Sequence, residues 1–215
     1  MAALDYDSVY TLQDKVLEII FSKETTFYLT GGTCLNRFYY NRRYSDDLDL
    51  FTNESALFRD DVRIVIEGLK SSSLGYTVIV DTRDFVRLNI GEKLQVDLVN
   101  DRVYRHGKSI ISSSGVIIDN ILNICANKLC AVIGRDDPKD MFDLYTIFEK
   151  GKIEWEAAIT AAIKKCIIDP EVLEYRLATF PLELLELLKV VQPDTVIEMK
   201  KNYTDMAKHI TELIP

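Results

Sequence analysis

The sequence contains few of the residues that mark fibrous, disulfide-rich or zinc-stabilised proteins. Its 215 residues include 5 prolines, 9 glycines, 4 cysteines and 2 histidines. So little proline and glycine excludes collagen-like and linker-like chains. No two cysteines form a Cys-x-x-Cys pair, which argues against a zinc site, and a chain of this size needs no disulfide framework. We therefore expect Cys34, Cys125, Cys130 and Cys166 to be buried, reduced thiols in a cytoplasmic protein.

Long apolar runs and an excess of basic residues are also absent. No apolar run reaches the roughly 18 residues of a membrane span, and the acidic N-terminus lacks the basic start of a secretory signal. We expect no membrane partner. The formal net charge of −8 has the wrong sign for a protein that coats nucleic acid, although it leaves room for a local RNA-binding patch. With 47% hydrophobic residues, the chain has enough apolar material for a core.

The hydrophobic pattern changes near residue 112. Strand-like alternation predicts strands at 26–30, 47–51, 76–81, 85–91 and 94–100, and helical spacing predicts helices at 8–23 and 56–70. Beyond that point the spacing is helical, and it predicts helices at 117–134, 140–150, 154–166, 170–178, 181–190 and 194–213. We therefore expect an α/β domain with a small mixed sheet over residues 1–112 and a helical bundle over 113–215, packed on it.

Gly31, Gly32 and Thr33 stand between an expected strand and an expected helix. Glycine lets the backbone approach a ligand closely, and the start of a helix offers free N–H groups to a phosphate. A GG pair at this place is also compatible with a plain turn. By itself, the pattern is compatible with a phosphate-binding site but does not distinguish one from a turn.

Asp47 and Asp49 alternate with apolar residues in DLDLF. Residues two apart on a strand share a face, so Leu48 and Leu50 are expected in the core and both carboxylates on the opposite face. Like charges on one face repel unless a cation lies between them, and Mg²⁺ is commonly held by one or two carboxylates and substrate phosphates. The alternative is a solvated acidic face.

Asp97 interrupts the apolar run of LQVDLVN, where an unpaired carboxylate is costly. If its strand lies beside that of Asp47 and Asp49, at the usual spacing of about 4.8 Å, the three acids form one cluster. Such a cluster can hold two metal ions about 3.5–4 Å apart for phosphoryl or nucleotidyl transfer. A strand-end residue at a turn is the other interpretation of Asp97.

The three features together make the sequence recognisable. TGGTCLNRFYYNRRYSDDLDLF resembles the GG(T/S)-x-L and R-x-S-x-D-x-D-x-F signature of the polymerase-β-like nucleotidyltransferases. More narrowly it resembles the AbiEii/AbiGii toxin family, the toxins of type IV toxin–antitoxin systems, with MenT-like relatives. The motif positions are matched by Arg43, Ser45, Asp47, Asp49 and Phe51.

A second segment carries the same resemblance. Lys128, Arg135, Asp140 and Asp143 stand where the family has its K-L-x-A, R and D-x-x-D-L positions. Lys139 replaces a common arginine, which keeps the charge but loses the planar fork. The resemblance covers roughly residues 25–150; the remaining residues match only in being helical.

The resemblance implies a polymerase-β-like core, an NTP donor, Mg²⁺ or Mn²⁺, a cognate antitoxin and an RNA acceptor, since family members of known activity modify tRNA 3′ ends. It implies that Asp47 and Asp49 hold the metal and the NTP phosphates. Asp97 is then expected to bind the second metal and to help activate an acceptor hydroxyl.

The remaining candidates are expected to serve the nucleotide. For nucleotide binding they are Gly31, Gly32, Thr33, Arg43, Ser45 and Lys128, with Lys128 as counter-charge to the triphosphate. Asp140 and Asp143 share a helix face, so they either orient a cation or assist proton removal. The alternatives are a lysine that extends to water and acids that stabilise a helix N-terminus.

Three other functions are alternatives to this one. A catalytically silent scaffold that binds a partner protein is disfavoured by the intact acids, and transfer to a protein hydroxyl stays open. A DxD-type phosphohydrolase usually has Thr or Val after the second Asp, where this chain has Leu50.

Overall fold

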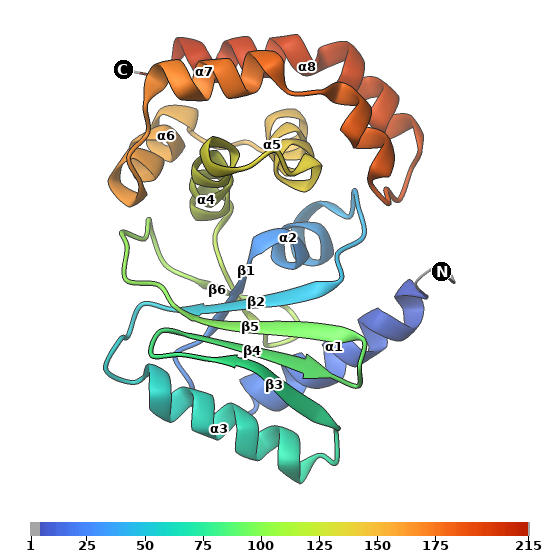
Figure 1. Ribbon diagram of the computed structural model, residues 1–215, viewed down its shortest axis with the longest axis vertical. Helices are drawn as coiled ribbons and strands as arrows, with labels where there is room; N and C mark the ends of the chain where they lie inside the picture. Colours follow the sequence, from blue (N-terminus) through green and yellow to red (C-terminus); the bar gives the residue numbers. More distant parts are fainter. Residues whose placement is uncertain (1–4, 215) are drawn as a thin grey trace. The chain divides into compact units, whose positions relative to one another are not determined.

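The computed structural model describes residues 5–214 (Figure 1). Along the chain the elements are α1 (Tyr6–Phe21), β1 (Tyr28–Thr30), α2 (Gly31–Cys34), the π-helix η1 (Leu35–Tyr40), β2 (Asp47–Thr52), α3 (Phe58–Ser71), β3 (Tyr76–Asp81), β4 (Phe85–Ile90), β5 (Leu94–Asn100), β6 (Ile110–Ile111), β7 (Ile117–Ile118), α4 (Ile121–Gly134), α5 (Pro138–Lys150), α6 (Trp155–Lys165), α7 (Pro170–Thr179), the 3₁₀-helix η2 (Leu182–Leu187) and α8 (Asp194–Glu212).

The elements form two compact units. The first contains the described residues up to Cys34 together with Ser45–Arg102 and Ser109–Asp119. The second contains Leu35–Tyr44, Val103–Lys108 and the chain from Asn120 onward. The domain boundary expected between residues 112 and 113 stays a prediction; it falls inside the third segment of the first unit.

The first unit is built on a seven-stranded mixed sheet in the order β3-β4-β5-β2-β1-β7-β6. β2 pairs with β5, and β1 with β7, in parallel; the other pairs are antiparallel. The β4–β5 hairpin turns at Gly91 and Glu92, both with positive φ, which is the conformation that a tight hairpin needs. The small mixed sheet expected from the sequence is confirmed.

Alternation along β2 and β4, with the apolar residues of β5 beside them, gives the central part of this sheet one apolar and one polar face. The apolar face is fully buried at Leu48, Leu50, Val86, Leu88, Val96 and Leu98. Helices α1 and α3 cover that face (Figure 1). Both are amphipathic, as the sequence predicted, and bury residues such as Val16 and Val65. The carboxylates of β2 therefore extend from the other face.

Two sequence predictions in the later half of the chain are wrong. The helix expected from residue 117 begins only at Ile121, because Ile117–Ile118 pair with β1 and β6 as strand β7. Asn120 stops any earlier start: its side chain accepts from the Asn123 N–H at 2.8 Å and caps α4. The segment 181–190 contains a 3₁₀-helix instead of an α-helix.

The second unit is mostly helical, as expected. Gly134 ends α4 and Pro138 begins α5, where the sequence had placed the break. Asp137 caps α5 through the Lys139 N–H. The unit buries large side chains such as Phe142 and Tyr145.

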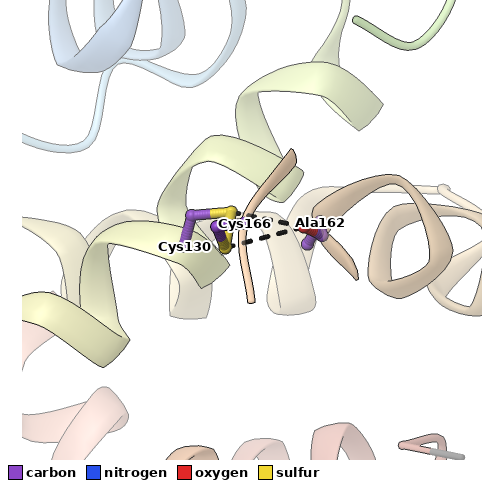
Figure 2. Close-up of a disulfide and its surroundings, with 3 residues drawn as sticks. All are labelled: Cys130, Ala162 and Cys166. Carbon is purple, nitrogen blue, oxygen red and sulfur yellow. Dashed lines mark hydrogen bonds between the residues drawn. A yellow bond between two sulfur atoms is a disulfide. The ribbon is translucent and has the colours of Figure 1, made fainter. Parts of the chain in front are cut away.

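The prediction that all four cysteines are reduced is wrong. Cys130 on α4 and Cys166 at the end of α6 form a disulfide with a Cα–Cα distance of 6.2 Å (Figure 2). The Cys130 and Cys166 sulfur atoms lie 3.5 and 3.6 Å from the Ala162 carbonyl oxygen. The pair is 36 residues apart in sequence, so only the packing of α4 on α6 brings it together. Cys34 and Cys125 are free and buried.

Among the helices of residues 5–214, none combines the length and the apolarity that crossing a membrane requires.

Candidate active site

The three acids lie on one face of neighbouring strands. In the parallel pair β2–β5, Asp49 is the direct partner of Asp97, and Asp47 is the partner of Gln95. Directly paired residues point to the same face, and residues two apart on one strand share it. The polar face therefore carries Asp47, Asp49 and Asp97 together, which confirms the placement expected from the sequence.

The Asp49–Asp97 pair belongs to a longer row that crosses the sheet. Arg87 on β4 is the partner of Asp97, and Thr30 on β1 is the partner of Asp49. The Thr30 hydroxyl in turn donates to Asp119 Oδ2 at 2.8 Å. We call these five residues the polar row. It places a cation at one end and a fully buried carboxylate at the other.

The glycine corner after β1 lies directly against the acids. Gly31 has φ +70°, and a Cβ built there would lie 2.2 Å from Asp49 Oδ2. Only glycine fits so close to the carboxylate in this conformation. The Thr33 hydroxyl donates to the Asp47 carbonyl oxygen at 2.5 Å. From the sequence, these residues are expected near a phosphate; in the structure, Gly31 lies against the Asp49 carboxylate.

Ser45 is buried in the segment just before β2. Its N–H donates to the Tyr10 hydroxyl at 3.2 Å, and its carbonyl oxygen accepts from Gln13 at 3.0 Å. Its hydroxyl donates to Asp47 Oδ1 at 3.4 Å. These contacts fix the entry into β2 and orient the first aspartate, and the predicted phosphate contact of Ser45 stays a prediction.

The donors on this face are carboxylate oxygens, which suit Mg²⁺ and Mn²⁺. Both oxygens of Asp97 accept from Arg87, at 2.8 and 2.7 Å. Within residues 5–214, no group of three or more His, Cys, Asp or Glu side chains is arranged to hold a metal ion. The carboxylates of Asp47 and Asp49 share one face of the sheet and are of the ligand type that holds Mg²⁺ together with phosphate oxygens, so these two residues fit such an ion.

The motif residues of the second unit form a buried charged cluster. Asp143 accepts from Arg43 Nε and Nη2 at 2.8 and 2.7 Å and lies 2.7 Å from Lys128 Nζ. The Asn36 side-chain amide donates to Asp143 Oδ1 at 3.1 Å. Asp140 accepts from Lys128 Nζ at 2.8 Å. Arg43 and Lys128 are 2% and 8% exposed, and Asp143 is fully buried.

The opposite charges of this cluster decide its protonation. Burial disfavours the charged form of Asp143, but Arg43 and Lys128 outweigh it and lower the pKa of the carboxyl from 3.8 to about 2. Burial likewise opposes the charge on Lys128, and Asp143 and Asp140 reverse its effect and raise the pKa of the ammonium group. Asp143 and Lys128 are therefore both charged at neutral pH.

Asp140 does not act only as a helix N-terminal acid. Besides Lys128, it accepts from Arg135 Nε at 2.7 Å. Burial raises its pKa, and the charge and hydrogen bonds of Lys128 and Arg135 more than offset that effect and lower it. These contacts agree with the alternative in which Asp140 orients a cation, here Lys128 and Arg135. The catalytic role of Asp140 and Asp143 stays a prediction.

Arg87, Thr30 and Asp119 of the polar row were not predicted from the sequence. The contact of Arg87 with Asp97 could have been predicted from the hairpin turn, which pairs Ile90 with Leu94. Counting three residues outward along each strand from that pair leads to Arg87 and Asp97. No local pattern pointed to Asp119, because the two-residue strand before it read as part of a helix.

The family of the chain follows from comparison with family models. The model of the AbiEii nucleotidyl transferase toxin, of the type IV toxin–antitoxin system, matches residues 16–215. The chain belongs to this family. The match confirms the resemblance carried by the motifs and extends it over the C-terminal helices, beyond residue 150. As a member of the AbiEii family, the protein is a nucleotidyltransferase.

Solved structures agree on the fold. Two chains from Helicobacter pylori, one of them JHP933, are similar with a TM-score of 0.61, at 18% and 17% identity; they cover 99% of this chain and 99% and 96% of their own. MenT4, a nucleotidyltransferase toxin from Mycobacterium tuberculosis, is similar with a TM-score of 0.55 at 12% identity, over 97% of this chain and 88% of its own. A comparison with curated proteins found no match. The expected nucleotidyltransferase fold is thereby confirmed.

Proposed function

We propose that this AbiEii-family protein transfers a nucleoside monophosphate from an NTP to a hydroxyl of RNA, at a tRNA 3′ end, and that a cognate antitoxin restrains it in the cytoplasm. The observation that supports this most directly is the in-register pair of Asp49 and Asp97, with Asp47 on the same face. Carboxylates grouped on one sheet face beside a glycine corner suit a magnesium-bound triphosphate.

In the proposed reaction the acceptor oxygen attacks the α-phosphorus of the NTP. The new bond is a phosphodiester, the bond to the β-phosphate oxygen breaks, and pyrophosphate leaves with the electron pair. A bound Mg²⁺ or Mn²⁺ supplies Lewis-acid stabilisation of the charge on the phosphate oxygens. Asp47 and Asp49 hold it, and the Gly31–Gly32 backbone and Ser45 accommodate the β- and γ-phosphates.

The acceptor must also lose a proton. On this proposal Asp97 stands beside the acid pair and assists the removal of that proton. Lys128 and Arg43 serve as counter-charges to the triphosphate, as the family motif implies.

The test is a transfer assay with the full chain, each of the four labelled NTPs, Mg²⁺ or Mn²⁺, and total RNA or purified tRNA. We expect label in RNA with at least one NTP. Asp49→Asn is expected to abolish transfer and to keep the far-UV circular dichroism of the wild type, because Asp49 extends from the face opposite the core. Asp46→Asn is the matched control; it removes the same charge three residues away and should retain transfer.

The other outcomes identify the alternatives. Label in a protein band and none in RNA would favour a protein hydroxyl as acceptor. No transfer with any NTP, combined with no nucleotide binding, would favour the silent scaffold. Full activity of Asp49→Asn would refute the assignment of the metal to this face.

A further inference from the structure

A row of apolar residues lies beside the polar row on the same face of the sheet. Phe85 on β4 is the partner of Val99 on β5, and Val99 is the partner of Phe51 on β2. Each of the three lies two residues along its strand from a member of the polar row, so it extends from the same face. We call Phe85, Val99 and Phe51 the apolar row. The strands that carry it lie side by side in the sheet (Figure 1).

The apolar row is less buried than the core face of the same strands. Phe85, Val99 and Phe51 are half-buried, whereas residues of the core face such as Leu50 and Leu98 are fully buried. Aromatic side chains that stay accessible beside polar groups form a surface on which a planar base can stack. One face of the sheet therefore presents carboxylates and a stacking surface next to each other.

Arg87 joins the two rows and supplies a positive charge. Its guanidinium lies over the Phe85 ring, 5.3 Å from the centroid, a cation–π arrangement. Nε and Nη2 donate to Asp97, and Nη1 has no acceptor among residues 5–214. The side chain of Arg87 is 37% exposed. Of the side chains that the strand registers place on this face of β1, β2, β4 and β5, that of Arg87 is the only basic one, so a phosphate that reaches this face would be bound through Nη1.

The in-line geometry of the proposed reaction places the acceptor at the apolar row. The proposed function puts the β- and γ-phosphates at Gly31 and Ser45. Strand β1 runs antiparallel to β2 and pairs Thr30 with Asp49, so Gly31 lies on the side of Asp49 toward the start of β2, and Phe51 lies on the other side. In an in-line displacement the attacking and leaving oxygens lie on opposite sides of the phosphorus. With pyrophosphate leaving at the glycine corner, the acceptor hydroxyl approaches from the side of the apolar row.

We propose that the apolar row and Arg87 form the binding site for the 3′-terminal nucleotide of the RNA acceptor, whose base stacks on the apolar row and whose phosphate accepts from Arg87 Nη1. The inference deepens the proposed function and rests on it. The terminal hydroxyl then lies beside Asp97, to which the proposed function assigns proton removal. Because stacking tolerates any base, such a site selects the end of an RNA strand and not its sequence.

The experiment measures RNA binding without catalysis, by fluorescence anisotropy of the full chain with Mg²⁺ and no NTP. The probe is a short single-stranded RNA with a 5′ fluorescein, made with either a normal or an abasic 3′-terminal nucleotide. Removal of the terminal base is expected to weaken binding to the wild type at least about fivefold. Phe85→Leu should bind the normal RNA as weakly as the wild type binds the abasic RNA, and should lose no further affinity with the abasic RNA.

Three further variants complete the design. Phe85→Tyr keeps the ring and should bind like the wild type. Tyr76→Leu is the matched control: Tyr76 pairs with Ile90, which is buried on the opposite face of the same sheet, so both affinities should stay unchanged. Arg87→Gln should reduce the slope of log Kd against log salt by about 0.7, the contribution of one phosphate contact with a single strand. Circular dichroism of each variant checks its fold.

The outcomes separate this inference from the proposed function. Equal affinity of the wild type for normal and abasic RNA, or equal affinity of the wild type and Phe85→Leu for normal RNA, would overturn the inference while transfer to RNA could still be observed. A rise in KM for the NTP in Phe85→Leu, with RNA binding unchanged, would overturn it by assigning the apolar row to the base of the donor. An unchanged salt slope in Arg87→Gln would overturn the phosphate contact. No label in RNA with any NTP would instead refute the proposed function, whatever the affinity for RNA.

Discussion

Replacing Asp143 by alanine removes the shared partner of two buried cations. Both Asp143 oxygens accept from Arg43, and Oδ2 also lies 2.7 Å from Lys128 Nζ. Asp143 is fully buried, so no water can take over its role without a change in packing. The substitution leaves Arg43 and Lys128 with a net positive charge inside the second unit.

The size of the effect follows from burial. Removing one partner of a buried ion pair costs about 3–5 kcal/mol. An exposed pair of the same length contributes only about 0–1 kcal/mol. Asp136 and Arg176 form such a pair at 2.7 Å, with side chains 52% and 29% exposed. We therefore expect Asp143→Ala to lose at least about 2 kcal/mol more free energy of unfolding than Asp136→Ala.

The assay is urea unfolding followed by tryptophan fluorescence. The chain has 1 tryptophan, Trp155, which is 7% exposed in the second unit and reports on that unit alone. Equal losses in Asp143→Ala and Asp136→Ala would refute the reasoning, because the buried cluster would then contribute no more than a surface pair.

Two further predictions concern the same unit. The folded pKa of Asp143 is about 2 against an ordinary 3.8, so the stability that this carboxylate contributes is present above pH 4 and is lost as the pH falls toward 2. Over that window the urea midpoint should decline by the equivalent of about 2–3 kcal/mol of unfolding free energy. The decline should be smaller in Asp143→Asn. Peptide mapping without reductant should find Cys130 joined to Cys166, and reduction should lower the stability of the second unit by about 4 kcal/mol for a 36-residue loop; an unchanged urea midpoint after complete reduction would contradict this.

The sheet of the first unit could be predicted because its signals are local. Alternation in DLDLF and LQVDLVN fixed which side chains face the core, and the short turn at Gly91 fixed the β4–β5 register. The two-residue strands β6 and β7 could not be predicted, since they are too short to show a period. Their existence depends on the pairing of Leu29 with Ile118, which lies far along the chain.

The candidate site was predictable in part for the same reason. The acids of β2 and β5 were identified, because a carboxylate that interrupts an apolar strand is visible in the sequence. Their partner Arg87 was not identified, because its contact with Asp97 arises between two paired strands. The disulfide was not predicted for the same reason. Its two cysteines are 36 residues apart, and only the packing of α4 on α6 shows that they are neighbours.

Replacing Lys128 tests whether this buried residue contacts the nucleotide or only stabilises the second unit. Lys128 is 8% exposed and contacts Asp140 and Asp143, so Lys128→Met leaves two buried carboxylates without that cation and is expected to destabilise the second unit. An unfolded fraction lowers the apparent kcat without moving KM, whereas a lost phosphate contact raises KM for the NTP. We expect Lys128→Met to raise KM for the NTP at least about tenfold, the equivalent of about 1.4 kcal/mol of binding, under conditions where Trp155 fluorescence shows a folded protein. A variant with lower kcat and an unchanged KM would assign Lys128 to the stability of the second unit and remove it from the nucleotide site.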